Sequence, residues 1–302
     1  MNTRKLWIAL ILFAATLFPQ TLFAQGLNWE GQTGALLTPF AYTAASPANK
    51  FGKPEVAFHY LNTGPVIGND YQLSLTEGIA KRFEIGYTAA FSSAGSKPLS
   101  YLFADGFSEF HGKATVVDEN AGKNKWVPAI AVGAIGRVGV QRVGQVVAYL
   151  SADDPTVSKS SKNGDFYIVA TKTVTQVKNF PFVLSFGEKV TNASVLGVAG
   201  NAPHWQGRLF GAAAFVVNGP KKSALIFGSE ALQEPHYVEG LGSGPGAPTI
   251  PTSLSYFVRV VPHIEGSPLQ VDLGVAQFAG KIAPGVDLQA RARVGLGISY
   301  HF

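Results

Sequence analysis

The sequence predicts an all-β protein that folds as a transmembrane, antiparallel, up-and-down β-barrel of about twelve strands. Three observations point to this fold class. The last seventeen residues, 286–302, alternate without exception between apolar side chains and other residues. Further segments with the same two-residue period precede them, and the connections between the segments run alternately long and short. Such alternation places one strand face in an apolar environment and the other in a polar one, which is typical of a barrel in a lipid bilayer.

The chain begins with a predicted secretory signal peptide, residues 1–24. Arg4 and Lys5 precede an apolar run over residues 6–18, and Ala24 supplies a small residue at the end. A run of thirteen apolar residues is shorter than the roughly 20 that a membrane-spanning helix needs, which favours a cleaved leader over an anchoring helix. The sequence contains no cysteine, which excludes disulfides, thiolate metal sites and a lipidated N-terminal cysteine.

Composition agrees with this fold class. Hydrophobic residues make up 46% of the chain and charged residues only 14%. Beyond the leader no run of eighteen apolar residues occurs, so we expect no membrane-spanning helix. Without the two basic residues of the leader, 22 basic residues face 19 acidic ones, and they are scattered along the chain. This distribution predicts no nucleic-acid partner.

Residues 25–53 are predicted to form an N-terminal segment that precedes the barrel, residues 54–302. The segment contains Gly34, Pro39 and Pro47 and shows little alternation. Two arrangements are open for it. It is either a periplasmic segment that caps the mouth of the barrel or a plug inside it.

The twelve predicted strands differ in how clearly they alternate. Seven segments have one apolar and one polar face: 55–60, 70–76, 82–91, 109–116, 205–217, 269–275 and 286–302. Five others have the composition of strands but are apolar on both faces in places: 126–136, 165–173, 180–188, 222–232 and 254–264. A short run at 194–200 is interpreted as a loop rather than as a thirteenth strand.

The connections provide an independent test of the barrel. Four of them are longer than fifteen residues: 92–108, 137–163, 189–204 and 233–253. The connections between these are shorter, and some carry turn residues such as Asn218-Gly219-Pro220. Outer-membrane barrels have long external loops and short periplasmic turns, and an even strand number returns both termini to the periplasm. A soluble double sandwich, the alternative, needs neither this rhythm nor a terminal aromatic residue.

Four stretches, taken in their order along the chain, carry a resemblance to a known family. They are Gly78–Tyr87, Val127–Gly133, Phe166–Lys172 and Phe210–Ala214. Through them the chain resembles a family of uncharacterised Gram-negative outer-membrane β-barrels, catalogued as a domain of unknown function. More distantly it resembles the barrel proteins associated with exopolysaccharide export. The resemblance implies a barrel in the outer membrane of a Gram-negative bacterium and brings no established activity.

The end of the chain carries a second resemblance. Residues 295–302 alternate and include Tyr300 and the terminal Phe302, which resembles the C-terminal assembly signal of outer-membrane proteins. The resemblance implies that the barrel-assembly machinery binds the last strand and that outer-membrane lipid surrounds the barrel.

If the apolar faces contact lipid, the opposite faces line the lumen. We expect the lumen to hold six acidic and six basic residues in all, with a narrow constriction near Arg82, Arg291 and Arg293. The last strand should pair with the first on closure. The candidate lumen residues are Glu55, His59, Arg82, Glu84, Lys113, Arg208, Arg259, Asp272, Asp287, Arg291 and Arg293.

Three functions are compatible with such a barrel. The first is a narrow passive channel for small polar or charged solutes, with mixed charges in its bore. The second is a non-conducting structural or accessory barrel for envelope assembly or polysaccharide export. The third is a transporter of small hydrophobic ligands, which apolar lumenal side chains near Ile130, Val169 and Val183 would favour.

Catalysis is not expected. No Gly-x-Ser-x-Gly motif and no pair of histidines at metal-binding spacing occurs in the chain. Three of the six histidines fall on predicted lumen faces, and the others lie near strand ends or in loops. Asp153 and Asp154 lack a third oxygen ligand nearby, and Glu84 and Asp287 are not set at a catalytic separation by any pattern. We therefore expect neither enzymatic activity, nor a bound metal, nor a cofactor.

Overall fold

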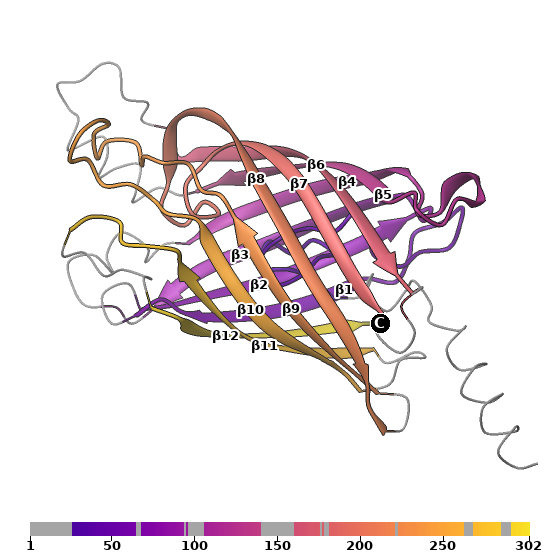
Figure 1. The fold of residues 1–302 in the computed structure, drawn as a ribbon. Coiled ribbons are helices and arrows are strands. Elements are labelled where there is room, and N and C mark those ends of the chain that lie inside the picture. The colour runs from indigo at the N-terminus through magenta and orange to yellow at the C-terminus, as the bar shows by residue number, and fades with distance from the viewer. Residues whose placement is uncertain are drawn as a thin grey trace, which may run out of the picture.

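The protein is a closed antiparallel barrel of twelve strands, each paired with its sequence neighbours and the last paired with the first (Figure 1). The computed structural model describes residues 26–64, 68–93, 95, 106–139, 160–175, 177, 181–220, 223–262, 268–284 and 291–302. The strands are β1 (Glu55–Asn62), β2 (Asn69–Ile79), β3 (Phe83–Ser93), β4 (Phe107–Val117), β5 (Ala129–Val138), β6 (Lys162–Val174), β7 (Phe182–Ala193), β8 (Asn201–Asn218), β9 (Ala224–Leu232), β10 (Ser253–Val261), β11 (Leu269–Phe278) and β12 (Arg293–His301). The predicted fold class is confirmed.

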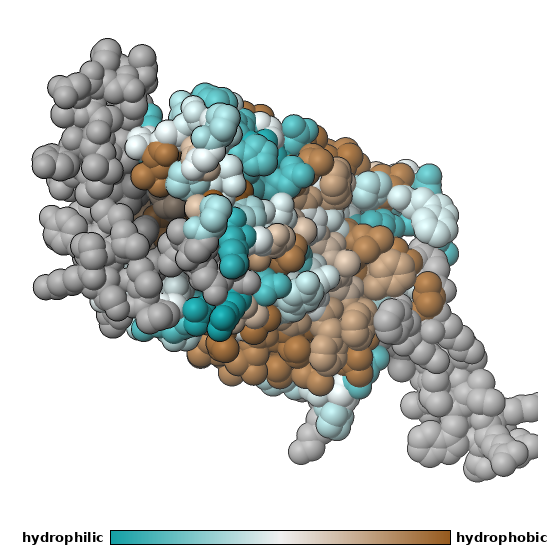
Figure 2. Space-filling model, turned by 60° about the vertical axis from the view of Figure 1, so that its left-hand side comes forward, coloured by the Kyte–Doolittle hydropathy of each residue, from teal (hydrophilic) through white to brown (hydrophobic). Residues whose placement is uncertain are grey.

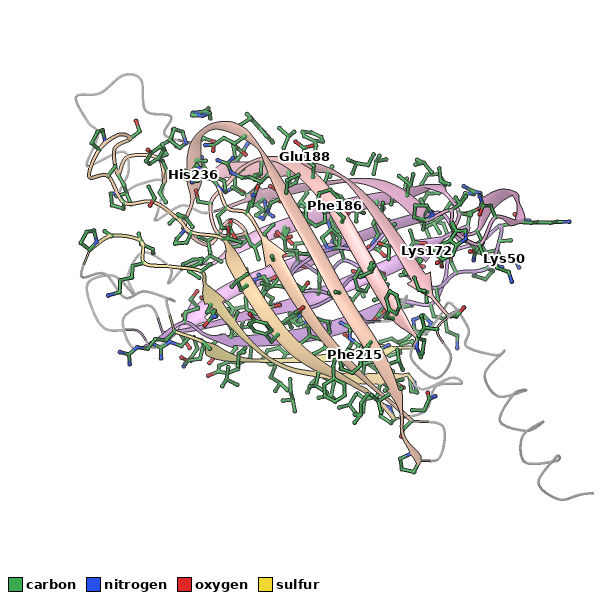
Figure 3. The ribbon with its side chains drawn as sticks, viewed as in Figure 1. Lys50, Lys172, Phe186, Glu188, Phe215 and His236 are labelled. Atoms are coloured by element: carbon green, nitrogen blue, oxygen red, sulfur yellow. The ribbon has the colours of Figure 1, made fainter. Side chains whose placement is uncertain are left out.

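The connections divide the barrel into two ends. At the short-loop end, where residue 302 lies, the strands are joined by residues 80–82, 118–128, 175–181, 219–223 and 262–268. At the long-loop end they are joined by residues 63–68, 94–106, 139–161, 194–200, 233–252 and 279–292. Lys50 and His236 mark these two ends in Figure 3.

The closing strand is shorter than its alternation predicts. The pattern runs over residues 286–302, whereas β12 begins at Arg293; residues 285–290 lie outside the described part of the chain. Its pairing starts at Arg293 opposite Ala276 of β11 and at Gly295 opposite Leu61 of β1. Alternation reports which face a residue would take, but a strand lasts only as long as its neighbours supply partners. The prediction of a seventeen-residue strand was therefore wrong, and the predicted pairing with the first strand is confirmed.

The outer face of the barrel is apolar. Along β2 and β7, buried and exposed residues alternate, and large hydrophobic side chains are left on the outside. Phe166, Phe186 and Phe110 are 62%, 61% and 54% exposed. Figure 2 shows a continuous hydrophobic area on the outer wall, bordered by hydrophilic residues. An exposed apolar surface on this scale is rare in a soluble monomer and marks contact with lipid or a partner.

Residues 26–44, called here the luminal segment, lie inside the barrel. Residues 26–41 are all buried, and their hydrogen bonds reach inward-facing side chains of nine strands: β1, β2, β3, β4, β5, β6, β9, β10 and β12. A segment that bonds to the wall in so many directions is surrounded by it. In Figure 1 this indigo stretch lies behind the front strands. The chain becomes exposed from Ala45 and leaves at the short-loop end, where the Gly52 amide donates to Gly78 O at 2.8 Å.

The luminal segment owes its compact shape to local turns. The Asn28 side-chain oxygen accepts hydrogen bonds from the amides of Glu30 and Gln32, an Asx-turn that reverses the chain. Gly31 adopts φ +80, and a Cβ there would come within 2.4 Å of Thr88 Oγ1 on the wall. Both the backbone angle and the close approach therefore require glycine at this position.

Candidate functional site

The lumen and the luminal segment together form the candidate site, and Glu230 of β9 is the wall residue that holds the segment most extensively. Its carboxylate accepts hydrogen bonds from the amides of Leu36, Leu37 and Thr38, at 3.1, 2.9 and 2.8 Å. The Thr38 hydroxyl donates to it at 2.7 Å, and Ser255, its cross-strand neighbour on β10, donates at 2.5 Å. A carboxylate that receives this many donors fixes the position of the backbone that supplies them.

Glu84 of β3 holds the segment at two further points. It accepts hydrogen bonds from the Thr33 and Ala44 amides at 3.1 and 2.7 Å and from the Thr33 hydroxyl at 2.5 Å. Lys113, directly opposite on β4, approaches Glu84 at 3.0 Å and donates to Thr33 O at 2.9 Å. The antiparallel register thus brings the two charged side chains together on the inner face.

Arg259 of β10 binds backbone oxygens of the segment. Its two terminal nitrogens donate to Gly34 O at 2.9 Å and to Ala35 O at 3.1 Å. Asp272, opposite on β11, receives Nε and one terminal nitrogen at 2.7 and 2.9 Å. This bidentate pair orients the guanidinium so that its remaining donors point at the segment.

Arg137 of β5 lies at the centre of a buried charge cluster that the sequence reasoning missed. It bonds to Glu30 of the luminal segment, to Glu109 of β4 at 2.7 Å and to Asp165 of β6 at 2.8 Å. One oxygen of Glu109 and one of Asp165 have no hydrogen-bond partner. Arg137 falls just beyond the predicted strand 126–136; extending its alternation by one residue would have placed Arg137 on the inner face.

Apolar side chains form the other part of the inner wall. The apolar wall, as used below, comprises Ala129, Ala131, Val169, Val183, Phe210, Ala212, Ala214, Val216, Ala224 and Ile226 of β5–β9. The luminal segment turns Trp29, Leu36, Leu37 and Phe40 into the same hydrophobic cluster. Val169 and Val183 lie inside as predicted, whereas Ile130 is half-buried between the buried Ala129 and Ala131 and so lies on the outer face.

Six of the predicted lumen residues are buried inside the barrel. They are Glu55, His59, Glu84, Lys113, Arg259 and Asp272. His59 contacts the Leu27 carbonyl oxygen at 3.0 Å, and Glu55 accepts a hydrogen bond from the Gly26 amide at 3.2 Å. The luminal segment therefore covers both of these wall residues.

The remaining predicted lumen residues do not form a constriction. Arg82 lies in the turn before β3, about half exposed, and pairs with Asp118. Arg291 is exposed ahead of β12, and Arg293 is only half-buried at its first position. Arg82 is at the short-loop end and the other two are at the long-loop end, so the predicted cluster of three arginines was wrong. The reason is that each lies at the end of its strand, where alternation no longer determines the side-chain direction.

Two predicted positions remain. Arg208 of β8 lies directly opposite the inward-facing Lys189 of β7 and is half-buried toward the long-loop end, where it bonds to Gln206 and to the Gly207 carbonyl oxygen. Asp287 lies outside the described residues.

The inner wall is acidic rather than balanced. Among the described strand residues, seven buried carboxylates face inward: Glu55, Asp70, Glu84, Glu109, Asp165, Glu230 and Asp272. Four buried basic residues accompany them: Lys113, Arg137, Lys189 and Arg259. The expected equality of six acids and six bases was wrong because Arg82 and Arg291 lie outside the strands, and Arg208 and Arg293 are only half-buried toward the long-loop end.

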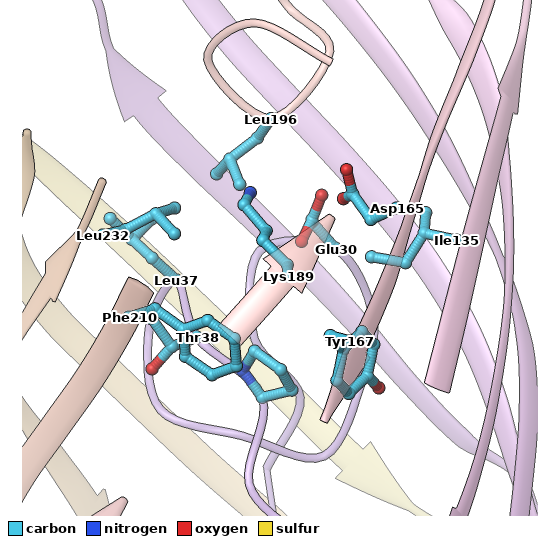
Figure 4. A pocket seen from close by; sticks show the side chains of 11 residues that line it. Glu30, Leu37, Thr38, Ile135, Asp165, Tyr167, Lys189, Leu196, Phe210 and Leu232 are labelled. Carbon is cyan, nitrogen blue, oxygen red and sulfur yellow. The ribbon is translucent and has the colours of Figure 1, made fainter. Parts of the chain in front are cut away.

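The cavity between the luminal segment and part of the wall is small. A cavity of about 10 Å³ lies between the segment and β5–β9, lined by residues that include Glu30, Leu37, Asp165, Lys189 and Phe210 (Figure 4). That volume is about what one water molecule requires. No solute larger than water fits this cavity while the segment is in place.

A buried carboxyl group also lies in a connection at the long-loop end. Glu234 accepts hydrogen bonds from the Ser253 hydroxyl at 2.7 Å and from the Val195 amide at 3.1 Å. Burial raises the pKa of Glu234 above its usual range, with Lys189 opposing the shift. Glu234, in the connection 233–252, is thus hydrogen-bonded both to β10 and to the connection 194–200 near the mouth.

The described residues contain neither a metal-binding cluster nor a helix that could span a membrane. No group of three or more His, Asp or Glu side chains there is arranged to hold a metal ion. Within the same residues, no helix is long and apolar enough to cross a membrane.

Comparisons with known proteins find similarity only among solved structures. No protein-family model and no curated protein matches the chain. The KdgM porin is 10% identical over 82% of this chain and 99% of its own, with a TM-score of 0.45. An outer membrane channel from Pseudomonas putida F1 is 9% identical over 85% of this chain and 97% of its own, with a TM-score of 0.47. The NanC porin is 6% identical over 82% of this chain and 98% of its own, with a TM-score of 0.45.

The resemblance to uncharacterised outer-membrane barrels and to exopolysaccharide-export barrels stays a prediction.

Proposed function

We propose that the protein is an outer-membrane channel for small polar or charged solutes that its own luminal segment holds closed. The apolar outer face supports a position in lipid, because water would solvate it poorly. A barrel that crosses a membrane must close its sheet to satisfy its backbone, and this sheet is closed. The polar part of the inner wall supports an aqueous path once the segment has moved.

One observation carries the proposal: a separate stretch of chain, rather than wall side chains alone, fills the bore. Glu230 and Glu84 accept hydrogen bonds from backbone amides of residues 33–44, and Arg259 donates to a backbone carbonyl oxygen of the same stretch. A bore filled by wall side chains could open only by distorting the barrel. A bore filled by a tethered segment can open when the segment withdraws toward the short-loop end, where it already leaves the barrel.

The short-loop end is proposed to face the periplasm, since short turns and chain termini lie there in outer-membrane barrels. Tyr300 and Phe302 remain proposed contacts of the barrel-assembly machinery. They lie together at this end, with ring centroids 5.0 Å apart and with 43% and 57% of their surfaces exposed.

A non-conducting structural or accessory barrel is the second candidate, and it covers the proposed role in polysaccharide export. The filled lumen favours it, because the buried polar groups of the wall are already bonded to the segment. In that case the segment would be a permanent part of the fold.

Conductance in planar bilayers tests the two candidates. The wild-type chain should be closed most of the time, with rare stepwise openings. Gly31→Val, whose side chain would collide with Thr88 on β3, should displace the segment and raise the open probability at least tenfold. Glu188→Gln, a change on the exposed outer face of β7, serves as the matched control and should behave as wild type (Figure 3).

Heat-modifiable migration in gels checks that each variant is a folded barrel. If folded Gly31→Val and a folded variant lacking residues 26–44 both carry no current, the protein is a non-conducting barrel and the channel proposal is wrong.

A further inference from the structure

We propose that the open pore selects cations, so that its solutes are small inorganic or organic cations. This inference rests on the proposed channel function and concerns the charge that the bore presents once the luminal segment has withdrawn.

The wall carries carboxylates that form no salt bridge with a wall cation, although Arg259 lies within electrostatic reach of Glu55 and Glu230. Three of the four basic residues are already paired with wall carboxylates: Lys113 with Glu84 at 3.0 Å, Arg137 with Glu109 at 2.7 Å and Asp165 at 2.8 Å, and Arg259 with Asp272 at 2.7 Å. Within the described residues, Glu55, Asp70 and Glu230 form no salt bridge with a basic side chain. The fourth base, Lys189, lies near Asp165 and Glu234 and does not reach these three.

In the closed state, neutral backbone donors compensate this excess of negative charge. Glu55 receives the Gly26 amide, and Glu230 receives those of Leu36, Leu37 and Thr38. The luminal segment itself carries one charged side chain, Glu30, which is also acidic. Withdrawal of the segment therefore leaves carboxylates that need a new positive partner.

The cluster around Arg137 points the same way by independent evidence. Glu109 Oε1 and Asp165 Oδ1 are buried without a hydrogen-bond partner even when the segment is present. When Glu30 leaves with the segment, Glu109 and Asp165 remain beside Arg137, with Lys189 also near Asp165. The two unpartnered oxygens are acceptors that an entering cation can satisfy.

Basic residues near the mouths do not reverse this selectivity. Arg82 and Arg291 are exposed outside the strands, and Arg208 and Arg293 are half-buried toward the long-loop mouth; salt screens exposed charges over about 8 Å. Charges inside a narrow bore are screened much less than charges at the mouths. The carboxylates that line the bore therefore determine which ions enter.

Reversal potentials in a KCl gradient test the inference on the full chain carrying Gly31→Val. We expect the reversal potential to lie between zero and the equilibrium potential of K⁺, which corresponds to K⁺ being several-fold more permeant than Cl⁻. Adding Glu55→Gln, Asp70→Asn and Glu230→Gln together should move the permeability ratio toward unity, and adding Glu188→Gln should leave it unchanged. A variant lacking residues 26–44 provides a second open pore if Gly31→Val does not fold.

The outcomes separate the two proposals. A pore that conducts with equal permeability or with preference for Cl⁻ overturns the cation inference and leaves the channel intact. Folded barrels that never conduct overturn the channel proposal itself, and the cation inference with it.

Discussion

The polar and apolar parts of the inner wall hold the same segment by different means. The polar wall, which comprises inward-facing polar side chains of β1–β4 together with Glu230 of β9 and Arg259 of β10, presents carboxylates, hydroxyls, His59 and a guanidinium that bond to individual backbone atoms of the segment. The apolar wall buries the side chains of Leu36, Leu37 and Phe40 without directional contacts. Hydrogen bonds depend on atom positions and burial depends mainly on area. The polar wall therefore fixes where the segment sits, and the apolar wall adds affinity for it.

Removing a polar contact should have the largest effect. Glu84→Ala deletes the acceptor for Thr33 and Ala44 and leaves Lys113 buried without its partner, which costs about 3–5 kcal/mol. The segment should lose its fixed position, so that the amides of residues 33 and 44 exchange hydrogen much faster. Hydrogen-exchange mass spectrometry measures this change.

A double variant is the control for this prediction. Glu84→Ala combined with Lys113→Met removes both charges and should recover part of the lost stability, because no buried charge is then left alone. Equal damage in the single and double variants would contradict the importance of the charge pair.

Removing an apolar contact should weaken the segment without shifting it. Leu37 is 6% exposed, and Leu37→Ala should cost about 2–3 kcal/mol by leaving a cavity against the apolar wall. Protection should fall to a similar extent at all amides of the segment, whereas Glu84→Ala acts mainly around residues 33 and 44. A localised loss of protection at residue 37 alone would contradict a purely non-directional role.

A pH change should act outside both walls, at Glu234. Because burial raises the pKa of this carboxyl group, the folded mouth prefers it protonated. Its contribution to stability is full at pH below its ordinary value and is lost as pH rises through the raised one. Exchange at the Val195 amide, corrected for intrinsic rates, should quicken as the pH rises, and Glu234→Gln should abolish that trend. If the pH dependence of exchange is unchanged in Glu234→Gln, a different titratable group causes it.

The smallest effect is expected at Arg82, which belongs to neither wall. Its pair with Asp118 is about half exposed, so Arg82→Gln should change the unfolding free energy by about 0–1 kcal/mol. Single-channel current through Gly31→Val should be the same with and without this change. A clear drop in current would restore Arg82 to the solute path.

Prediction from the sequence succeeded where a local pattern decides the outcome. Phe58, Leu73 and Ile85 alternate with polar neighbours, and their strands pair as neighbours in the barrel. The same rule placed Glu84 and Lys113 on the inner face. It failed at Arg82 and Arg291, which follow the alternating pattern beyond the last paired residue.

Arg137 and Asp165 show a second limit. Their strands are apolar along much of both faces, so alternation did not single out a polar inward position. Only the pairing of β4, β5 and β6 brings Glu109, Arg137 and Asp165 side by side.

The sequence by itself determined the strand number and the apolar outer face, whereas the predicted long connection 189–204 was wrong because β7 extends to Ala193 and β8 begins at Asn201. These properties follow from contacts between a strand and its immediate neighbours, which a two-residue period and turn residues encode locally. Tertiary structure alone decided that residues 26–44 occupy the bore and that the bore is acidic. Glu230 meets Thr38 across 192 residues of chain, and such a contact exists only after the barrel has closed around the segment. No local pattern encodes which distant backbone amide a buried carboxylate will accept.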